Sequence, residues 1–337
     1  MTAWLHGEIE KSFVAPWRGA TERSIFGDAG AQEIVEALDR ACVTAFSSGL
    51  EDGFLYRVSV GCVIGCRLAD GREVVLKAFQ PRWTEAFLAA VQRVQSHLHL
   101  NGFPCPAPIG ASLRVAGAVV LAEHVLVDPG LTTPTKEAMQ PSAGGLARVV
   151  ELCKNQREPA LALHPLRPPD DHVFPEPHSP LFDFAATRAG AEWIDEIAAQ
   201  AAVVRDEDNS EPVIAHTDWA LRNVRLGTAG PVAVYDWDSL SLVPESHALG
   251  GAAATWCKTG EPGDTYAPST EDIDEYITAY ESARGAGLTS VQRRAARAAA
   301  VWTMAYTARC EHSMDPGEEV WTTTRPQLRA DARALLS

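Results

Sequence analysis

Polar side chains that could act on a phosphate or a metal ion gather in one stretch, residues 212–240, which reads PVIAHTDWALRNVRLGTAGPVAVYDWDSL. Two apolar runs in this stretch lead directly into polar residues, and a strand that ends in this way delivers a side chain to a rigid site. The polar residues are His216, Asp218, Asn223, Asp236 and Asp238. Carboxylate and amide oxygens suit Mg²⁺, which binds through one or two carboxylates together with substrate phosphates.

Each of these residues also has a simpler explanation, because Asp and Asn are common in turns and caps. Any one of them could serve that purpose alone. The whole array between two apolar strands favours a phosphate or metal site instead. Within it, Asp238 could reach a metal directly or act through a neighbour.

The segment 216–223, HTDWALRN, is similar to the H-x-D-x-x-x-x-N catalytic loop of the aminoglycoside phosphotransferase and choline kinase-like families. These families are relatives of the protein kinases. Their loop commonly reads HGDLHPGN and is followed, after an apolar strand, by IDWE or IDWD; this chain has VYDWD at 234–238. The resemblance covers about residues 50–315 and implies a kinase that transfers the γ-phosphate of ATP or GTP.

The resemblance also assigns roles to the matching positions. Asp218 would accept the proton of the substrate hydroxyl or orient it for in-line attack, while His216 would support the catalytic loop by hydrogen bonding. Asn223 and Asp236 would hold the Mg²⁺ ions that bridge the nucleotide phosphates.

Lys77 is the only lysine of an apolar run, EVVLKAF. A charge there is costly unless it meets a partner such as a phosphate, although an edge lysine could instead extend its amine to solvent. The resemblance places a phosphate-binding lysine on such a strand, and Gly61 could let the preceding backbone approach the phosphates. Related kinases pair this lysine with a glutamate of the next helix. Gln92 stands near that position here, but we expect Glu85, the only acid of the helix, to take the role.

The run VVLAEHVLVDPG, residues 119–130, is similar to the segment that links the two lobes in these families. By this resemblance, backbone groups of Glu123, His124 and Val125 would contact the adenine ring. Backbone hydrogen bonds leave no side-chain signature, so this assignment depends on the resemblance alone.

Hydrophobic periodicity predicts the elements that must position these residues. For the first part of the chain it predicts a helix over 30–46, strands over 54–68 and 73–79 around the turn 69–72, a helix over 83–100, and strands over 108–115 and 117–127. For the second part it predicts helices over 144–157 and 189–205, short strands over 212–216, 223–227 and 231–236, and two or three helices from about 270. The proline-rich segment 159–180 is predicted to be a long surface loop.

These elements predict an α+β chain with a protein kinase-like, two-lobe fold. Residues 1–125 would form a nucleotide-binding lobe with a small antiparallel sheet and an N-terminal helical extension. Residues 126–337 would form a larger, mainly helical lobe for catalysis and substrate binding.

The composition limits the partners. A net charge of −15 disfavours nucleic acid and anionic membranes, and it suits a cationic substrate. We find neither a long uncharged apolar run nor a signal peptide, so a cytoplasmic protein is expected. The seven scattered cysteines indicate reduced thiols rather than a metal site.

Three functions remain open at this point. The leading hypothesis is an O-phosphotransferase acting on an aminoglycoside or another basic antibiotic, which would confer antibiotic resistance. The second is a metabolite kinase acting on a sugar, amino sugar or amino alcohol, and the third is a nucleotide-binding protein that has lost catalysis. Acidic residues of the helix 189–205, such as Asp195, could bind an amine or form a solvated face. Trp219, Trp237 and Trp256 could stack on a substrate or lie in the core. The sequence leaves the oligomeric state open.

Overall fold

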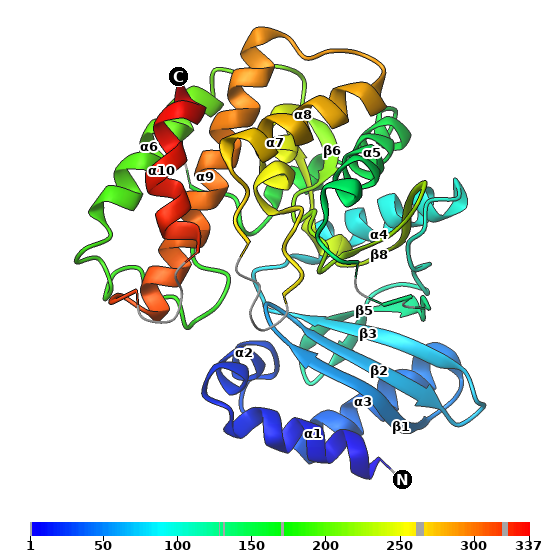
Figure 1. Cartoon of the computed structure of the whole chain (residues 1–337). Coiled ribbons are helices and arrows are strands. Elements are labelled where there is room, and N and C mark those ends of the chain that lie inside the picture. The colour runs from blue at the N-terminus through cyan, green and yellow to red at the C-terminus, as the bar shows by residue number, and fades with distance from the viewer. Residues whose placement is uncertain (1, 128, 131, 170–171, 261–265, 319–322) are drawn as a thin grey trace. The chain divides into compact units, whose positions relative to one another are not determined.

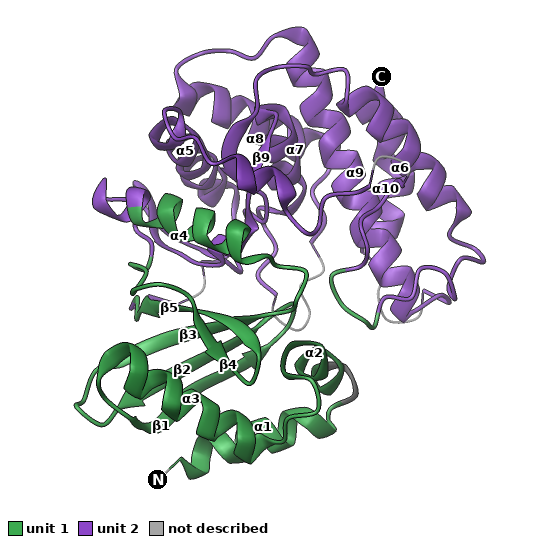
Figure 2. Ribbon diagram, turned by 180° about the vertical axis from the view of Figure 1, so that it is seen from behind, with its two compact units in different colours: residues 1–96, 106–126, 178–181 green, residues 97–105, 127–177, 182–337 purple. Residues whose placement is uncertain are grey.

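The computed structural model describes residues 2–127, 129–130, 132–169, 172–260, 266–318 and 323–337. The chain forms two compact units (Figure 2). Unit 1 contains residues 1–96, 106–126 and 178–181, and unit 2 contains residues 97–105, 127–177 and 182–337. Each unit is therefore built from more than one segment of the chain, because 97–105 belong to unit 2 and 178–181 to unit 1.

Unit 1 combines an antiparallel sheet with helices, as predicted (Figure 1). Its helices are α1 (Ala3–Val14), α2 (Pro16–Phe26), α3 (Ala31–Phe46) and most of α4 (Glu85–Leu100). Its strands are β1 (Leu50–Val58), β2 (Cys62–Leu68), β3 (Glu73–Phe79), β4 (Leu113–Val115) and β5 (Ala118–His124). All neighbours in the sheet are antiparallel, in the order β1-β2-β3-β5-β4.

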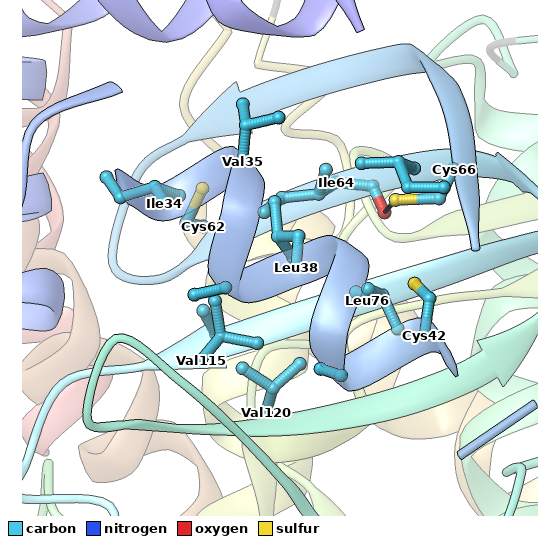
Figure 3. Packing of buried hydrophobic residues seen from close by; sticks show 14 of the residues in the cluster. Ile34, Val35, Leu38, Cys42, Cys62, Ile64, Cys66, Leu76, Val115 and Val120 are labelled. Atoms are coloured by element: carbon cyan, nitrogen blue, oxygen red, sulfur yellow. Dashed lines mark hydrogen bonds between the residues drawn. The ribbon is translucent and has the colours of Figure 1, made fainter. Parts of the chain in front are cut away.

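The core of unit 1 lies between α3 and one face of this sheet (Figure 3). Leu76 of β3 is paired with Ile64 of β2 and Ala122 of β5, so the three side chains share a face. Ile34 and Leu38 of α3 belong to the same buried cluster, and both are fully buried. Burying one such aliphatic side chain contributes about 1.5–3 kcal/mol to stability. Because a one-residue slip would turn these side chains to the other face of the sheet, their burial fixes the register of the strands.

One predicted strand is two strands. The run 54–68 contains the end of β1, a turn at residues 59–61, and β2; Ser59 N donates to Gly61 O at 2.9 Å inside the turn. The apolar pattern continues across the turn, and no Asn-Gly or Asp-Gly pair marks it, so the sequence conceals it.

Unit 2 is mainly helical and carries two short antiparallel strand pairs. Its helices are α5 (Lys136–Cys153), α6 (Glu192–Arg205), α7 (Glu245–Thr255), α8 (Thr270–Arg284), α9 (Ser290–Met314) and α10 (Thr324–Leu336), with short 3₁₀ helices η1 (Pro159–Leu163) and η2 (Trp237–Ser239). Its strands are β6 (Val213–His216), β7 (Val224–Gly227), β8 (Gly230–Val234) and β9 (Leu240–Val243). β6 pairs with β9, and β7 pairs with β8.

Several boundaries in unit 2 differ from the predictions. α5 begins at Lys136 rather than 144 and continues through Pro141, which lies in its second turn. β9 and α7 were not predicted, since Pro244 and the pair Gly250-Gly251 suggest a break. Gly250 is required for packing instead: a Cβ there would lie 2.1 Å from the Ala296 carbonyl oxygen of α9. Part of the predicted loop 159–180 is η1, and residues 170–171 lie outside the described residues.

No helix within the described ranges is both long enough and apolar enough to span a bilayer. The seven cysteines are buried free thiols.

Candidate active site

The segment with HTDWALRN follows strand β6, and its neighbours hold it through the main chain. His216 ends β6 opposite Leu240 of β9. Just beyond the strand, Thr217 donates to Ser239 O from both its N–H and its Oγ1, each at 2.9 Å. Farther on, Leu221 N donates to Trp256 O at 2.9 Å and Arg222 N donates to Lys258 O at 2.8 Å. The loop is thus tied at both ends to backbone atoms.

His216 is fully buried, and its two ring nitrogens have different partners. Nδ1 accepts the backbone N–H of Asp218 at 3.3 Å, so the proton is on Nε2, which donates to Tyr235 O at 3.0 Å. The edges of Trp219 and Trp237 pack against the ring, with centroids 5.6 and 5.5 Å away. This arrangement favours the supporting role expected for His216 over proton transfer.

Asp218 presents a carboxylate whose side chain is 32% exposed. Oδ2 accepts a hydrogen bond of 2.8 Å from Asn223 Nδ2, and Oδ1 forms an ion pair with Arg222. Burial alone would raise the pKa of Asp218, but the charge of Arg222 and the hydrogen bonds from Arg222 and Asn223 outweigh it, so the pKa lies below its usual value. The group is ionised at neutral pH. Since a carboxylate offers about four acceptor positions, it can still accept a substrate hydroxyl.

The β7–β8 hairpin explains why Asn223 and Asp236 are far apart in sequence and close in the fold. Val224 pairs with Val234, and Tyr235 N donates to Asn223 O at 2.9 Å. Asp236 is the next residue after this bond. The hairpin therefore brings both predicted metal ligands to the same end of the β7–β8 pair.

The side-chain oxygen of Asn223 is the atom that could bind a cation. Its nitrogen is committed to Asp218, donating to the backbone O at 3.0 Å and to Oδ2, and both of these atoms can only accept. This settles which end of the amide is oxygen. Among the described residues no group of three or more His, Cys, Asp or Glu could hold a metal ion. A cation bound at Asn223 and Asp236 would complete its coordination with phosphates and water.

Asp236 has a left-handed backbone, with φ 65° and ψ 46°, at the start of η2. Asp and Asn tolerate this region better than other residues with a side chain, but it remains an uncommon conformation. Ser239 N donates to Asp236 O at 3.0 Å and thereby closes the turn. Asp238, the other acid of the stretch, is half-buried in η2.

The three tryptophans considered as stacking platforms are core residues. Trp219 is fully buried and donates from Nε1 to Ser142 O of α5 at 3.0 Å. Trp237 is fully buried and donates to Val234 O at 3.0 Å, while Trp256 is 2% exposed and stacks on Tyr276 of α8. The structure thus assigns them to packing beneath the loop.

In unit 1, Lys77 is 8% exposed and lies in the middle of β3. It is paired with Val63 of β2 and Leu121 of β5. Because side chains alternate along a strand, Lys77 points to the sheet face opposite the one that Leu76 buries against α3. Gly61 lies in the turn between β1 and β2.

Glu85, the expected partner of Lys77, forms an ion pair with an arginine of unit 1. Glu85 begins α4, its side chain is 56% exposed, and it forms an ion pair with Arg114. Gln92 donates to Gly110 O at 3.3 Å. The pairing of Glu85 with Lys77 stays a prediction, and this surface ion pair lends it no support.

A buried polar pair not predicted from the sequence lies on the Lys77 side of the sheet. Gln95 of α4 is 1% exposed and donates to Glu123 Oε1 at 3.0 Å; Glu123 is 5% exposed and is paired with Val75, two residues before Lys77. The only signal in the sequence was a glutamine within the apolar stripe of α4.

The predicted adenine contacts fall at the end of β5. The backbone N–H of His124 already donates to Ala107 O at 2.9 Å, and Glu123 forms a bridge with Pro108. Val125, 39% exposed, is the first of the three predicted residues that lies beyond the strand. The contacts at Glu123, His124 and Val125 remain predictions.

Arg222 is the main functional candidate that the sequence did not reveal. Its position four residues after Asp218 was visible, but a charged residue in a loop usually points to solvent.

The acid considered for amine binding on α6, Asp195, instead lies 3.4 Å from the buried Arg309 Nε.

Comparisons with known proteins bear on the family and the fold. The family model described as the phosphotransferase enzyme family matches residues 66–292. A search of curated proteins returned no match. Among solved structures, the chain is similar to an amicoumacin kinase in complex with AMP-PNP, Ca²⁺ and Ami, with 11% identity, a TM-score of 0.61, and coverage of 90% of this chain and 95% of that one.

Two further structures share the fold. A microcompartment-associated aminopropanol kinase has 13% identity, a TM-score of 0.61, and coverage of 87% and 94%. A thermostable mutant of an aminoglycoside phosphotransferase, in a ternary complex with ADP and hygromycin B, has 12% identity, a TM-score of 0.51, and coverage of 88% and 98%. At these identities the likeness establishes the protein kinase-like fold that was predicted.

Proposed function

Since this chain belongs to the phosphotransferase enzyme family and is a small-molecule phosphotransferase, we propose that it moves the γ-phosphate of ATP or GTP to a hydroxyl group of an amine-bearing small molecule. The observation that carries the proposal is the ionised and oriented carboxylate of Asp218. Its carboxylate is held ionised by Arg222 and oriented by Asn223, in a loop anchored by main-chain hydrogen bonds.

Asp218 would accept the hydroxyl proton of the acceptor or orient that hydroxyl for in-line attack on the γ-phosphorus. The bond from the γ-phosphorus to the bridging oxygen breaks as the bond to the acceptor oxygen forms, and the nucleoside diphosphate leaves. His216 keeps the loop in place during this step, because both of its ring nitrogens are engaged with the backbone.

The donor set at Asn223 and Asp236 fits a magnesium ion. Asn223 offers an amide oxygen, Asp236 offers a carboxylate, and the hairpin fixes both backbones. When bound, Mg²⁺ would neutralise charge on the nucleotide phosphates. In unit 1, Lys77 is the proposed phosphate-binding cation, and the strand end at Val125 is the proposed base-contacting segment.

An aminoglycoside or another basic antibiotic is the proposed acceptor class. The net charge of −15 supports a cationic substrate, and Ami and hygromycin B are the compounds named with two of the similar structures. Antibiotic resistance and a cytoplasmic location are parts of the same proposal. The likeness to an aminopropanol kinase favours a second candidate, an amino alcohol of metabolism. Loss of catalysis is disfavoured, because Lys77, Asp218, Asn223 and Asp236 are present together.

The direct test is nucleotide consumption with Mg²⁺ and either ATP or GTP across aminoglycosides, peptide antibiotics, amino sugars and choline-like alcohols. We expect acceptor-dependent release of nucleoside diphosphate with at least one amine-bearing alcohol, and a phosphorylated product by mass spectrometry. Turnover only with neutral sugars would contradict the substrate class. Nucleotide binding without turnover on any acceptor would favour the non-catalytic alternative.

A pH profile tests the role of Arg222. Its guanidinium lowers the pKa of Asp218, so the stabilisation from this pair is present above the unfolded-state pKa of Asp and is lost as the pH falls through the folded-state pKa. In Arg222→Gln the pKa of Asp218 should rise, and the acidic limb of kcat/KM should move to higher pH. Well above that limb, kcat should stay within about fivefold, the effect of an exposed ion pair.

The control for this variant is Arg297→Gln, which removes an arginine 3.0 Å from Asp274. It should leave the acidic limb in place. An unmoved limb in Arg222→Gln would show that Arg222 does not set the ionisation of Asp218.

A further inference from the structure

The turn between β1 and β2 is fastened by two buried side chains from different parts of unit 1. Thr21 of α2, 1% exposed, donates from Oγ1 to Ser59 O at 3.1 Å. Gln80, which follows β3 and is 9% exposed, donates to Val60 O at 2.6 Å. Two consecutive carbonyls of a short turn are therefore each committed to a side chain.

This fastening determines where the amide hydrogens of the turn point. In a trans peptide the C=O and N–H groups point in opposite directions. With the Ser59 and Val60 carbonyls turned toward Thr21 and Gln80, the N–H groups of Val60 and Gly61 point away from those two side chains. Successive backbone N–H groups with fixed directions are a common device for binding phosphate oxygens.

The residue next to Thr21 binds strand β1, which leads into the turn. Glu22 is fully buried, and its Oε1 accepts a hydrogen bond from the Tyr56 hydroxyl of β1. Burial raises the pKa of Glu22 above its usual value against the opposing effects of Tyr56, Ser12, Arg18 and Arg23, so its carboxyl resists ionisation.

The helices that carry these residues are built into the unit. Leu5 and Ile9 of α1 are fully buried in the core cluster, and Leu5 N donates to Asp52 Oδ1 of β1 at 3.2 Å. Close approach depends on two glycines. A Cβ on Gly53 would lie 2.9 Å from the Trp4 ring, and one on Gly19 would lie 2.4 Å from Phe13 O.

We infer that the α1–α2 extension is a positioning element for nucleotide binding: through Thr21 it holds the β1–β2 turn with the Val60 and Gly61 N–H groups set to receive phosphate oxygens. The family match begins at residue 66, after both helices and the turn, so this device is not part of the matched region. The inference rests on the proposed function, in which unit 1 binds the nucleotide.

The test compares Thr21→Val, which removes the hydroxyl but keeps the shape, with Thr21→Ser, which keeps the donor. Thr44→Val is the matched control, since Thr44 Oγ1 donates at 2.8 Å to Arg40 O on the exposed side of α3. Two quantities are measured on the full chain: hydrogen exchange of the 59–61 amides without nucleotide, and the Kd of ATP and of GTP with Mg²⁺.

In Thr21→Val we expect faster exchange at the turn and a Kd raised about 3- to 10-fold, the worth of one buried hydrogen bond. KM for nucleotide should rise in parallel, with kcat at saturating nucleotide little changed. Thr21→Ser and Thr44→Val should behave like the unmodified chain. Tyr56→Phe, which frees β1 from Glu22, should also raise both exchange and Kd.

The failure of each idea has its own signature. Unchanged exchange in Thr21→Val would show that the extension does not hold the turn. Faster exchange with an unchanged Kd would show that the turn does not serve the nucleotide, and either result overturns the inference alone. No nucleotide binding by the unmodified chain would overturn the proposed function and the inference together.

Discussion

Asp218→Asn is expected to lower kcat by on the order of 10²- to 10⁴-fold, the usual contribution of a positioned general base. Asn keeps the size of Asp, but its single side-chain oxygen can accept from Arg222 or from Asn223 and not from both, and it cannot take a proton. The Kd for Mg²⁺–nucleotide should stay within a few-fold, because the proposed phosphate and metal contacts belong to Lys77, Asn223 and Asp236. Single-turnover kinetics and a nucleotide titration would separate the two effects.

The control for this variant is Asp274→Asn. Asp274 of α8 pairs with Arg297 of α9 at 3.0 Å, so the change again removes one carboxylate from an arginine pair. Its kcat should match that of the unmodified chain, and thermal unfolding should show both variants folded. Near-normal turnover by Asp218→Asn would remove Asp218 from its catalytic role.

Asp236→Asn is expected to lower activity by on the order of 100-fold or more and to raise the Mg²⁺ concentration that gives half-maximal rate. The change removes the negative charge that the proposed cation site needs. It keeps a residue type that tolerates φ 65°, so the loss can be attributed to the ligand and not to the backbone. The measurement is initial rate against Mg²⁺ at fixed nucleotide, repeated with Mn²⁺.

Asp236→Ala serves as the comparison. Alanine also removes the ligand, and its left-handed backbone adds strain of about 1–2 kcal/mol. Both variants should lose activity, but Ala should have the lower Tm. An Asn variant with an unchanged Mg²⁺ response would contradict the metal role of Asp236.

The parts of the site that the sequence predicted are those carried by strands and hairpins. Two apolar runs ending in polar residues predicted where Asp218 and Asp236 lie, because a strand has a fixed direction and a hairpin fixes which residues face each other. The resemblance of HTDWALRN then supplied the chemistry. The α3 stripe was equally legible, because Ile34 and Leu38 follow helical spacing.

What the sequence could not show depends on contacts between distant residues. Gln95 and Glu123 are far apart in the sequence and come into contact only in the folded unit, so the residues around each of them do not predict their hydrogen bond. The ion pair between Arg222 and Asp218 depends on the conformation of the loop, which the sequence does not reveal. The tryptophans could be assigned to the core only once the fold showed them buried, with Trp219 bonded to Ser142 of α5.

The start of α5 and the whole of α7 were not predicted, because residues that usually interrupt a helix lie inside both. Pro141 and the pair Gly250-Gly251 signal breaks, yet α5 and α7 run through them; in α7, Gly250 makes room for α9. At the β1–β2 turn the error was the reverse, because the sequence carries no signal of a break where the chain does turn. Its residues continue the apolar run, so a single strand was predicted.

The main-chain anchoring of the catalytic loop has a consequence for evolutionary drift. The bonds that hold it, from Thr217, Leu221 and Arg222 to carbonyls of neighbouring segments, use backbone atoms that every residue but proline can supply. These bonds do not depend on which side chains lie between Asp218 and Asn223, although Trp219 and Arg222 make contacts of their own. HTDWALRN differs from HGDLHPGN at all five variable positions, and its backbone bonds still hold the Asp218 carboxylate in an ordered frame.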